Sequence, residues 1–263
     1  MCTGFVRRGN DVIAGFNMDI NIGAFEYKVF VEDDKFYIGS YTGNIESAIM
    51  GNIDISENYF IENHYRKIQG VNNRGCFGNQ LNNMDFHKAP FRIDEKAFPI
   101  DQLIDDYISG RSTLDDIINL VNEKEIVNIP TGAIDIPNLA FHSILSDSEG
   151  RIMILEPGNG YSIIQEKYAV LSNFAMLEIP GDFVPEKFGY YGKDRYDKAM
   201  ELLRESTDDF SVNEGLEILN AVKQIGNLAT RVSFVYSRNE NAVYYTLEGD
   251  FDNVTRHQFK EVK

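Results

Sequence analysis

The order of strand-like and helix-like segments constrains the fold of this chain more than any other feature of its sequence. Apolar residues recur at strand-like spacing in three regions, and each gap between these regions reads as a pair of amphipathic helices. Strict strand-helix alternation is typical of parallel sheets, whereas runs of strands separated by helix pairs favour two stacked sheets with helices outside. The pattern therefore predicts an α+β fold.

The expected strands are short apolar segments between turn residues. Turns are predicted at 33–34 and 73–75, where Asp, Asn and Gly cluster. The strands of the first region are expected at 12–16, 28–32, 36–40, 68–71 and 75–81. In the second region, 140–171, a turn at 147–150 joins "FHSIL" to "RIMILEP", and "YAVLSN" follows as a further strand. The third region is predicted to form a hairpin with its turn at 239–241, in the segment "RVSFVYSRNENAVYYTLEG". Its weak alternation of apolar and polar residues suggests strands that are covered on both faces.

The helix pairs are defined by apolar stripes and by residues that begin or end helices. The first helix is expected between Pro99, which is tolerated in a first helical turn, and Gly110, which typically ends a helix. Its apolar stripe comprises Ile100, Leu103, Ile104, Tyr107 and Ile108. Ser112 is predicted to cap the next helix. The second pair is expected at 185–204 and 212–226. Because no repeat or polar linker suggests a boundary, residues 1–263 are expected to form a single domain.

Composition excludes several classes of function. With 25 basic and 41 acidic residues, the net charge of −16 argues against nucleic-acid binding, which needs clustered cations. Two cysteines in 263 residues form no disulfide framework, and no apolar stretch is long enough for a signal peptide or a membrane span, so a cytoplasmic protein without membrane contact is expected. The histidines lack ligand spacing and the glycines form no phosphate-binding loop, so no metal or other cofactor is expected.

The N-terminus, "MCTG", places a cysteine directly after the initiator methionine. Methionine is normally trimmed before a small residue, which would leave Cys2 with a free α-amine beside its thiol. The reference pKa of an α-amine is about 7.7 to 8.0, so the amine can accept the thiol proton as a general base. One residue would then supply both nucleophile and base.

Six ordered segments extend this pattern along the chain. "MCTG" is followed by "GFNMDI", "GVNNRGCFGNQLN", "LAFHSILSDSEGRIMILEP", "AVLSN" and "PGDFVP". In order and spacing, these segments resemble the choloylglycine hydrolase family of N-terminal-nucleophile hydrolases, which includes conjugated bile-salt hydrolases and penicillin V acylases. The resemblance spans essentially the whole chain. It implies a four-layer αββα sandwich and cleavage of a linear amide through a cysteine acyl-enzyme.

The resemblance also assigns roles to five residues. Cys2 matches the nucleophile, and Asp19, in "NMD", matches the aspartate that orients the α-amine and thiol. Asn82, in "QLN", matches the position whose backbone amide lines the oxyanion pocket, although a one-residue slip would select Asn83 instead. Asn173, in "LSN", matches the asparagine whose side-chain amide donates to the oxyanion. Arg231, in "TRVSFVY", is the candidate for a late arginine near the sulfur.

Two departures from the family pattern affect these expectations. Phe16 stands where the family usually has arginine, which removes a cation beside the thiolate and leaves Arg7, Arg8 or Arg231 to compensate. In bile-salt hydrolases, a long loop after the position of Asn173 wraps around a neighbouring subunit, and here only the short segment "FAMLEIP" stands in its place. The tetramer of those enzymes is therefore not expected for this chain. A homo-oligomer of another kind is still possible.

The predicted activity is hydrolysis of a small-molecule N-acyl amide of the bile-salt conjugate, penicillin V or N-acyl amino acid type. Two alternatives stay open. An acyltransferase would pass the same acyl group to an amine, and the missing arginine is compatible with a catalytically silent member that binds a small ligand.

Cys76, the second cysteine, lies in an apolar segment and is expected to be a buried small hydrophobic residue without a catalytic role.

Overall fold

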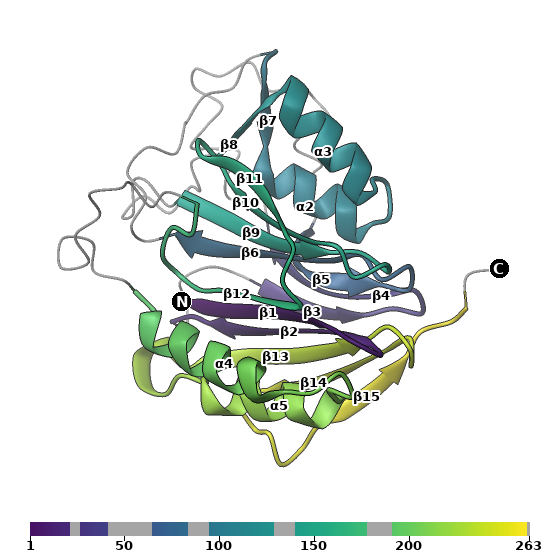
Figure 1. Ribbon diagram of the computed structural model, residues 1–263, viewed down its shortest axis with the longest axis vertical. Coiled ribbons are helices and arrows are strands. Elements are labelled where there is room, and N and C mark those ends of the chain that lie inside the picture. Colours follow the sequence, from purple (N-terminus) through teal and green to yellow (C-terminus); the bar gives the residue numbers. More distant parts are fainter. Residues whose placement is uncertain (22–26, 42–64, 84–94, 129–139, 178–190, 262–263) are drawn as a thin grey trace.

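The fold consists of two large antiparallel sheets stacked face to face, as seen in the computed structural model (Figure 1). The structure describes residues 1–21, 27–41, 65–83, 95–128, 140–177 and 191–261. One sheet runs in the order β12 (Tyr168–Leu171), β1 (Cys2–Arg8), β2 (Val12–Asp19), β13 (Thr230–Ser237), β14 (Ala242–Leu247) and β15 (Thr255–Gln258). The other runs in the order β11 (Gly160–Ile164), β10 (Ile152–Glu156), β9 (Ala140–Ser146), β6 (Phe77–Asn83), β5 (Tyr65–Asn72), β4 (Lys35–Tyr41) and β3 (Tyr27–Val31).

Two helices cover the outer face of each sheet. Helices α2 (Ile100–Ile108) and α3 (Leu114–Glu123) pack on the seven-stranded sheet, and α4 (Lys193–Glu205) and α5 (Val212–Ala221) pack on the six-stranded sheet (Figure 1). A short parallel pair, β7 (Ala97–Pro99) and β8 (Glu125–Val127), flanks the first two helices. The predicted four-layer αββα sandwich is confirmed.

Strand β2 shows how the sequence specifies the layers. Its even-numbered residues, including Phe16, belong to the core between the two sheets, while Ile13 packs towards α4 and α5. Side chains on both faces are therefore buried, which accounts for the nearly continuous apolar run at the start of this strand. Gly15 lies against the Phe5 ring of β1, and a side chain at this position would overlap that ring.

Aromatic rings fill the centre of the core between the sheets. Phe234 of β13 is fully buried, and its ring centroid lies 5.0 Å from that of Phe36, 5.9 Å from that of Phe16 and 5.9 Å from that of Phe77. These rings come from both sheets, so the cluster holds the two sheets together. Phe16, the residue at the family arginine position, is part of this apolar centre.

The strand predictions are confirmed within a few residues, but five of the described strands were not predicted. The N-terminal strand β1 was missed, as were β7, β8, β11 and β15. The predicted turns at 33–34, 73–75, 147–150 and 239–241 all occur. Strand β1 escaped prediction because small and charged residues at its ends weaken the strand signal, whereas pairing with β2 and β12 on both sides stabilises it.

All four predicted helices are present in the described ranges, but several of their ends were predicted wrongly. The N-cap of α3 is Thr113, not Ser112: the Thr113 hydroxyl accepts from the Asp116 amide at 3.2 Å, and the Asp116 carboxylate accepts from the Thr113 amide at 2.8 Å. This reciprocal capping box needs an acidic residue three positions later, which favours Thr113. The predicted helix at 185–204 begins at Lys193 in the described part, and residues 185–190 lie outside it. The helix predicted at 212–226 ends at Ala221, before a 3-10 turn, Gly226–Leu228.

In the part of the chain that the structure describes, no helix has the length and apolar character needed to cross a membrane.

Truncating the central ring should destabilise the fold. Phe234→Ala leaves a cavity among three aromatic rings and should lower the free energy of unfolding by about 3 to 5 kcal/mol, as measured by urea denaturation. Leu247→Ala is the control, because Leu247 is 48% exposed at the end of β14 and should change stability by less than about 0.5 kcal/mol. Equal losses in the two variants would contradict the central role of the aromatic cluster.

Candidate active site

Strands β1 and β2 bring Cys2 and Asp19 to the same end of the six-stranded sheet. Cys2 pairs with Met18 in the antiparallel register, so Asp19 follows directly after the partner of Cys2. Cys2 is 6% exposed and Asp19 is fully buried. The Met1 ammonium donates to the Asp19 carbonyl, and the Asp19 amide donates to the Met1 carbonyl at 2.7 Å. The peptide nitrogen of Cys2 thus stands where an α-amine would be after removal of Met1.

Asn173 connects Cys2 to the other sheet. It follows β12, the neighbour of β1, and its side-chain oxygen accepts from the Cys2 nitrogen at 2.8 Å. Its side-chain nitrogen donates to the carbonyl of Asn82 on β6 at 2.6 Å. Three of the predicted site residues, Cys2, Asn82 and Asn173, are therefore joined in one hydrogen-bonded chain. The contact made by Asn82 uses its backbone carbonyl, whereas the sequence prediction concerned its amide.

Arg195 is the residue that the sequence analysis missed. Its guanidinium, only 3% exposed, donates to the Cys2 carbonyl at 2.7 Å, the Asp19 carboxylate at 3.1 Å and the Asn173 side-chain oxygen at 2.8 Å. It also donates to the Thr3 hydroxyl at 2.7 Å. A sequence signal for this role existed. Arg195 precedes Ala199 by four residues and Leu203 by eight, so helical spacing places all three on the buried face of α4. A cation on a buried face requires a hydrogen-bonding or charged partner.

Arg231 lies at the start of β13, between Thr230 and Val232, which pair with Asp19 and Met18. Its guanidinium forms an ion pair with Glu248, which is 62% exposed. The cation whose charge affects the Cys2 thiol is Arg195, together with the N-terminal ammonium. The structure therefore places Arg195 of α4 in this cluster, and a role for Arg231 near the sulfur stays a prediction.

The other arginines named in the sequence analysis do not replace the missing cation at position 16. Arg7 donates to the Ser206 hydroxyl at 2.9 Å and to the Thr207 carbonyl at 2.7 Å, at the far end of β1. Arg8 donates to the Gln165 carbonyl. Both interactions fix loops beside the sheet. Cys76, also as expected, is a buried residue of the core under α2.

Burial controls the electrostatics of the cluster. It raises the pKa of Asp19 to about 6, although the Thr230 hydroxyl at 2.6 Å and the Arg195 guanidinium both favour the carboxylate. Burial also raises the pKa of the Cys2 thiol, and the N-terminal ammonium and Arg195 partly oppose this effect. The thiol is therefore protonated at neutral pH and requires a base before it can act as a nucleophile.

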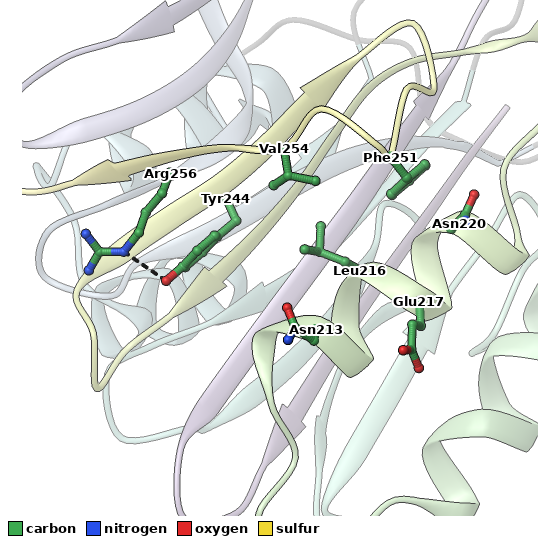
Figure 2. A pocket seen from close by; sticks show the side chains of 8 residues that line it. All are labelled: Asn213, Leu216, Glu217, Asn220, Tyr244, Phe251, Val254 and Arg256. Carbon is green, nitrogen blue, oxygen red and sulfur yellow. Dashed lines mark hydrogen bonds between the residues drawn. The ribbon is translucent and has the colours of Figure 1, made fainter.

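The described parts of the chain give no support to metal binding. Among these residues, no group of three or more His, Cys, Asp and Glu side chains could hold a metal ion. A groove of about 500 Å³ lies between α5 and the strands β14 and β15 (Figure 2). It is lined by Asn213, Leu216, Glu217, Asn220, Tyr244, Phe251, Val254 and Arg256, and it contains none of the predicted catalytic residues.

Comparison with known proteins identifies the fold. No protein-family model and no curated protein matches the sequence. A cysteine-to-alanine mutant of conjugated bile acid hydrolase from Clostridium perfringens matches at 14% identity with a TM-score of 0.63, over 98% of this chain and 92% of that one. Penicillin V acylase from Agrobacterium tumefaciens matches at 14% identity with a TM-score of 0.57, over 98% and 86% of the two chains. The chain therefore has a choloylglycine hydrolase-like fold, as the resemblance implied.

The raised pKa of Asp19 should make stability depend on pH. With a pKa of about 6 in the folded chain and a reference value near 3.8, the folded state binds more protons than the unfolded state in the window between these values. The contribution of Asp19 to the free energy of unfolding therefore falls as pH rises, by about 1 kcal/mol between pH 5.0 and 7.5. Urea denaturation of wild type and Asp19→Asn at both pH values isolates this contribution, and a rise with pH would contradict it.

Proposed function

We propose that the protein hydrolyses a linear N-acyl amide through an acyl-enzyme on Cys2, after removal of Met1. The observation that carries this proposal is the position of the Cys2 nitrogen. It lies 2.8 Å from the Asn173 side-chain oxygen, in a buried cluster that also contains Asp19 and Arg195. After processing, this nitrogen would be an α-amine next to its own thiol, in contact with groups that fix its orientation.

The first half of the reaction forms the acyl-enzyme. The α-amine takes the thiol proton, and the thiolate attacks the substrate carbonyl carbon to form a C–S bond. Asp19, once ionised, favours the resulting ammonium. As the C–N bond breaks, the ammonium returns its proton to the leaving amine. Water then attacks the thioester while the α-amine again accepts a proton. As the C–S bond breaks, the ammonium returns this proton to the sulfur, and the carboxylic acid leaves with the thiol and the amine restored.

Asn173 is the proposed donor to the oxyanion. Its side-chain nitrogen carries two N–H bonds, and one of them is used by the Asn82 carbonyl at 2.6 Å. The second can be donated to the negatively charged oxygen of the tetrahedral intermediate. Arg195 holds the Asn173 oxygen at 2.8 Å and so fixes the orientation of the amide. Losing one such donor typically costs a hundredfold or more in kcat.

The proposed substrate has an apolar acyl group and a small polar amine. The similar solved structures include hydrolases of conjugated bile acids and an acylase of penicillin V, which supports an amide substrate for this chain. A net charge of −16 gives no support to an anionic conjugate, so we favour a general linear amide over bile-salt conjugates. Conjugated bile acids, penicillin V and N-acyl amino acids form the test panel. Product analysis with added amine separates hydrolysis from acyl transfer.

One observation favours a second candidate, a catalytically silent protein that binds a small ligand. Phe16 places an apolar ring where the family has an arginine, and the Cys2 thiol has a raised pKa. Titration with a thiol reagent and an activated ester distinguishes the two. Stoichiometric acylation of Cys2 supports the hydrolase, whereas a Cys2 no more reactive than Cys76 supports the silent protein.

Processing of the N-terminus is the first requirement of the mechanism. Intact-mass spectrometry should show a protein lighter than the full sequence by one methionine, because a retained Met1 would block the base. In this processed protein, Cys2→Ala and Cys2→Ser should both abolish turnover. Turnover by a sample that retains Met1, or by Cys2→Ala, would refute the assignment of the nucleophile.

The two candidate arginines can be separated by mutation. Arg195→Gln removes the cation that contacts Asp19 and Asn173 and should lower kcat by about a hundredfold or more. Arg231→Gln breaks only an ion pair with an exposed glutamate and should change kcat by less than about threefold. Steady-state kinetics on the best substrate of the panel measures both, and the reverse result would return the role to Arg231.

A further inference from the structure

A second buried charge cluster lies near the proposed site, and the mechanism does not use it. His142 of β9 is fully buried, and Glu156 at the end of β10 is 1% exposed. Both occupy the face of the seven-stranded sheet that meets the six-stranded sheet, in line with Ile144 and Ile154. Charged groups are rarely placed in such a core unless their contacts serve a purpose.

The imidazole of His142 bridges two acceptors. One ring nitrogen, Nε2, lies 2.6 Å from the Ser172 carbonyl, and the other, Nδ1, lies 3.1 Å from the Glu156 carboxylate. A carbonyl can only accept, so Nε2 donates to Ser172. Glu156 also accepts from two backbone amides, and together with His142 these outweigh burial and lower the pKa of its carboxyl.

Both members of the pair hold the segment that carries Asn173. His142 binds the carbonyl of Ser172, directly before Asn173. Glu156 accepts from the amides of Met176 at 2.6 Å and Leu177 at 3.0 Å, three and four residues after Asn173. Strand β12 ends at Leu171, so residues 172–177 have no sheet partner of their own. Three backbone groups of this segment are instead fixed by two side chains from the opposite sheet.

We propose that His142 and Glu156 are positioning residues that hold the Asn173 amide in place to receive the oxyanion. This inference rests on the proposed function for its catalytic consequence, but its geometric part does not depend on it. His142 acts through the Ser172 carbonyl and Glu156 through the Met176 and Leu177 amides. Neither side chain is required to touch the substrate.

The first test separates positioning from stability. Glu156→Gln should lower kcat by roughly tenfold to a hundredfold, with KM changed by less than about threefold, because loss of a supporting contact weakens transition-state stabilisation more than substrate binding. Alkylation of Cys2 by iodoacetamide needs no oxyanion donor, so its rate should stay within about twofold of the wild-type value. Unchanged kcat, or alkylation that falls in parallel with kcat, would overturn the proposal.

The control breaks a different buried ion pair, which joins the same sheet to α2. Lys67 of β5 and Asp105 of α2 lie 3.1 Å apart, and both are buried. Asp105→Asn should lower the melting temperature but leave kcat within about twofold of wild type. If Glu156→Gln fails to fold, the double variant His142→Gln/Glu156→Gln replaces the ion pair with a neutral hydrogen-bonding pair and takes its place. A matching loss of kcat in Asp105→Asn would mean that the effect is general destabilisation, and the proposal would fail.

The second test does not depend on activity. The side-chain amide of Asn173 gives a pair of NMR signals in ¹⁵N-labelled protein, assigned by their loss in Asn173→Asp. Glu156→Gln should shift or broaden this pair, whereas Asp105→Asn should not. Unchanged signals in Glu156→Gln would overturn the positioning role. If the wild-type protein cleaves no amide of the panel while these signals respond as expected, the proposed hydrolase fails and the positioning role stands.

Discussion

The burial of one guanidinium is the interaction on which the candidate site depends. Arg195 contacts groups from β1, from the end of β2 and from the segment after β12, all of which are far from α4 in the sequence. An arginine taken out of water must satisfy its donors, or its burial would cost several kcal/mol. These acceptors hold the helix, the six-stranded sheet and Asn173 in one relative position. The site and the packing of α4 are therefore parts of the same arrangement.

The fold was more predictable than its details because its main signals are local. Apolar stripes locate α2, α3 and α5, and turn residues at 147–150 and 239–241 mark two hairpins. Strand β1 and the exact helix ends were harder to predict. The pairing of β1 with two neighbours stabilises a segment of ordinary propensity, and the choice of Thr113 over Ser112 depends on a side chain three positions later.

Prediction of the site divides in the same way. Cys2, Asp19 and Asn173 stand in short motifs, and the structure brings all three together. The arginine could not be chosen by motif alone. The helical spacing of Arg195 with Ala199 and Leu203 indicates a buried face, but the acceptors opposite that face are set by the folded chain. His142 shows the same limit. Its partners, Glu156 and Ser172, come from different strands, and only the stacking of the sheets brings them within hydrogen-bonding distance.

The aromatic centre between the sheets also bears on how this chain could change during evolution. Phe16 packs against Phe234, which in turn packs against Phe36 and Phe77. An arginine at position 16 would place a cation among apolar rings, where its desolvation would have to be offset by new acceptors. Those acceptors would have to come from replacements on both sheets. A single substitution to arginine at this position is therefore expected to destabilise the chain, and its neighbours favour retention of the phenylalanine.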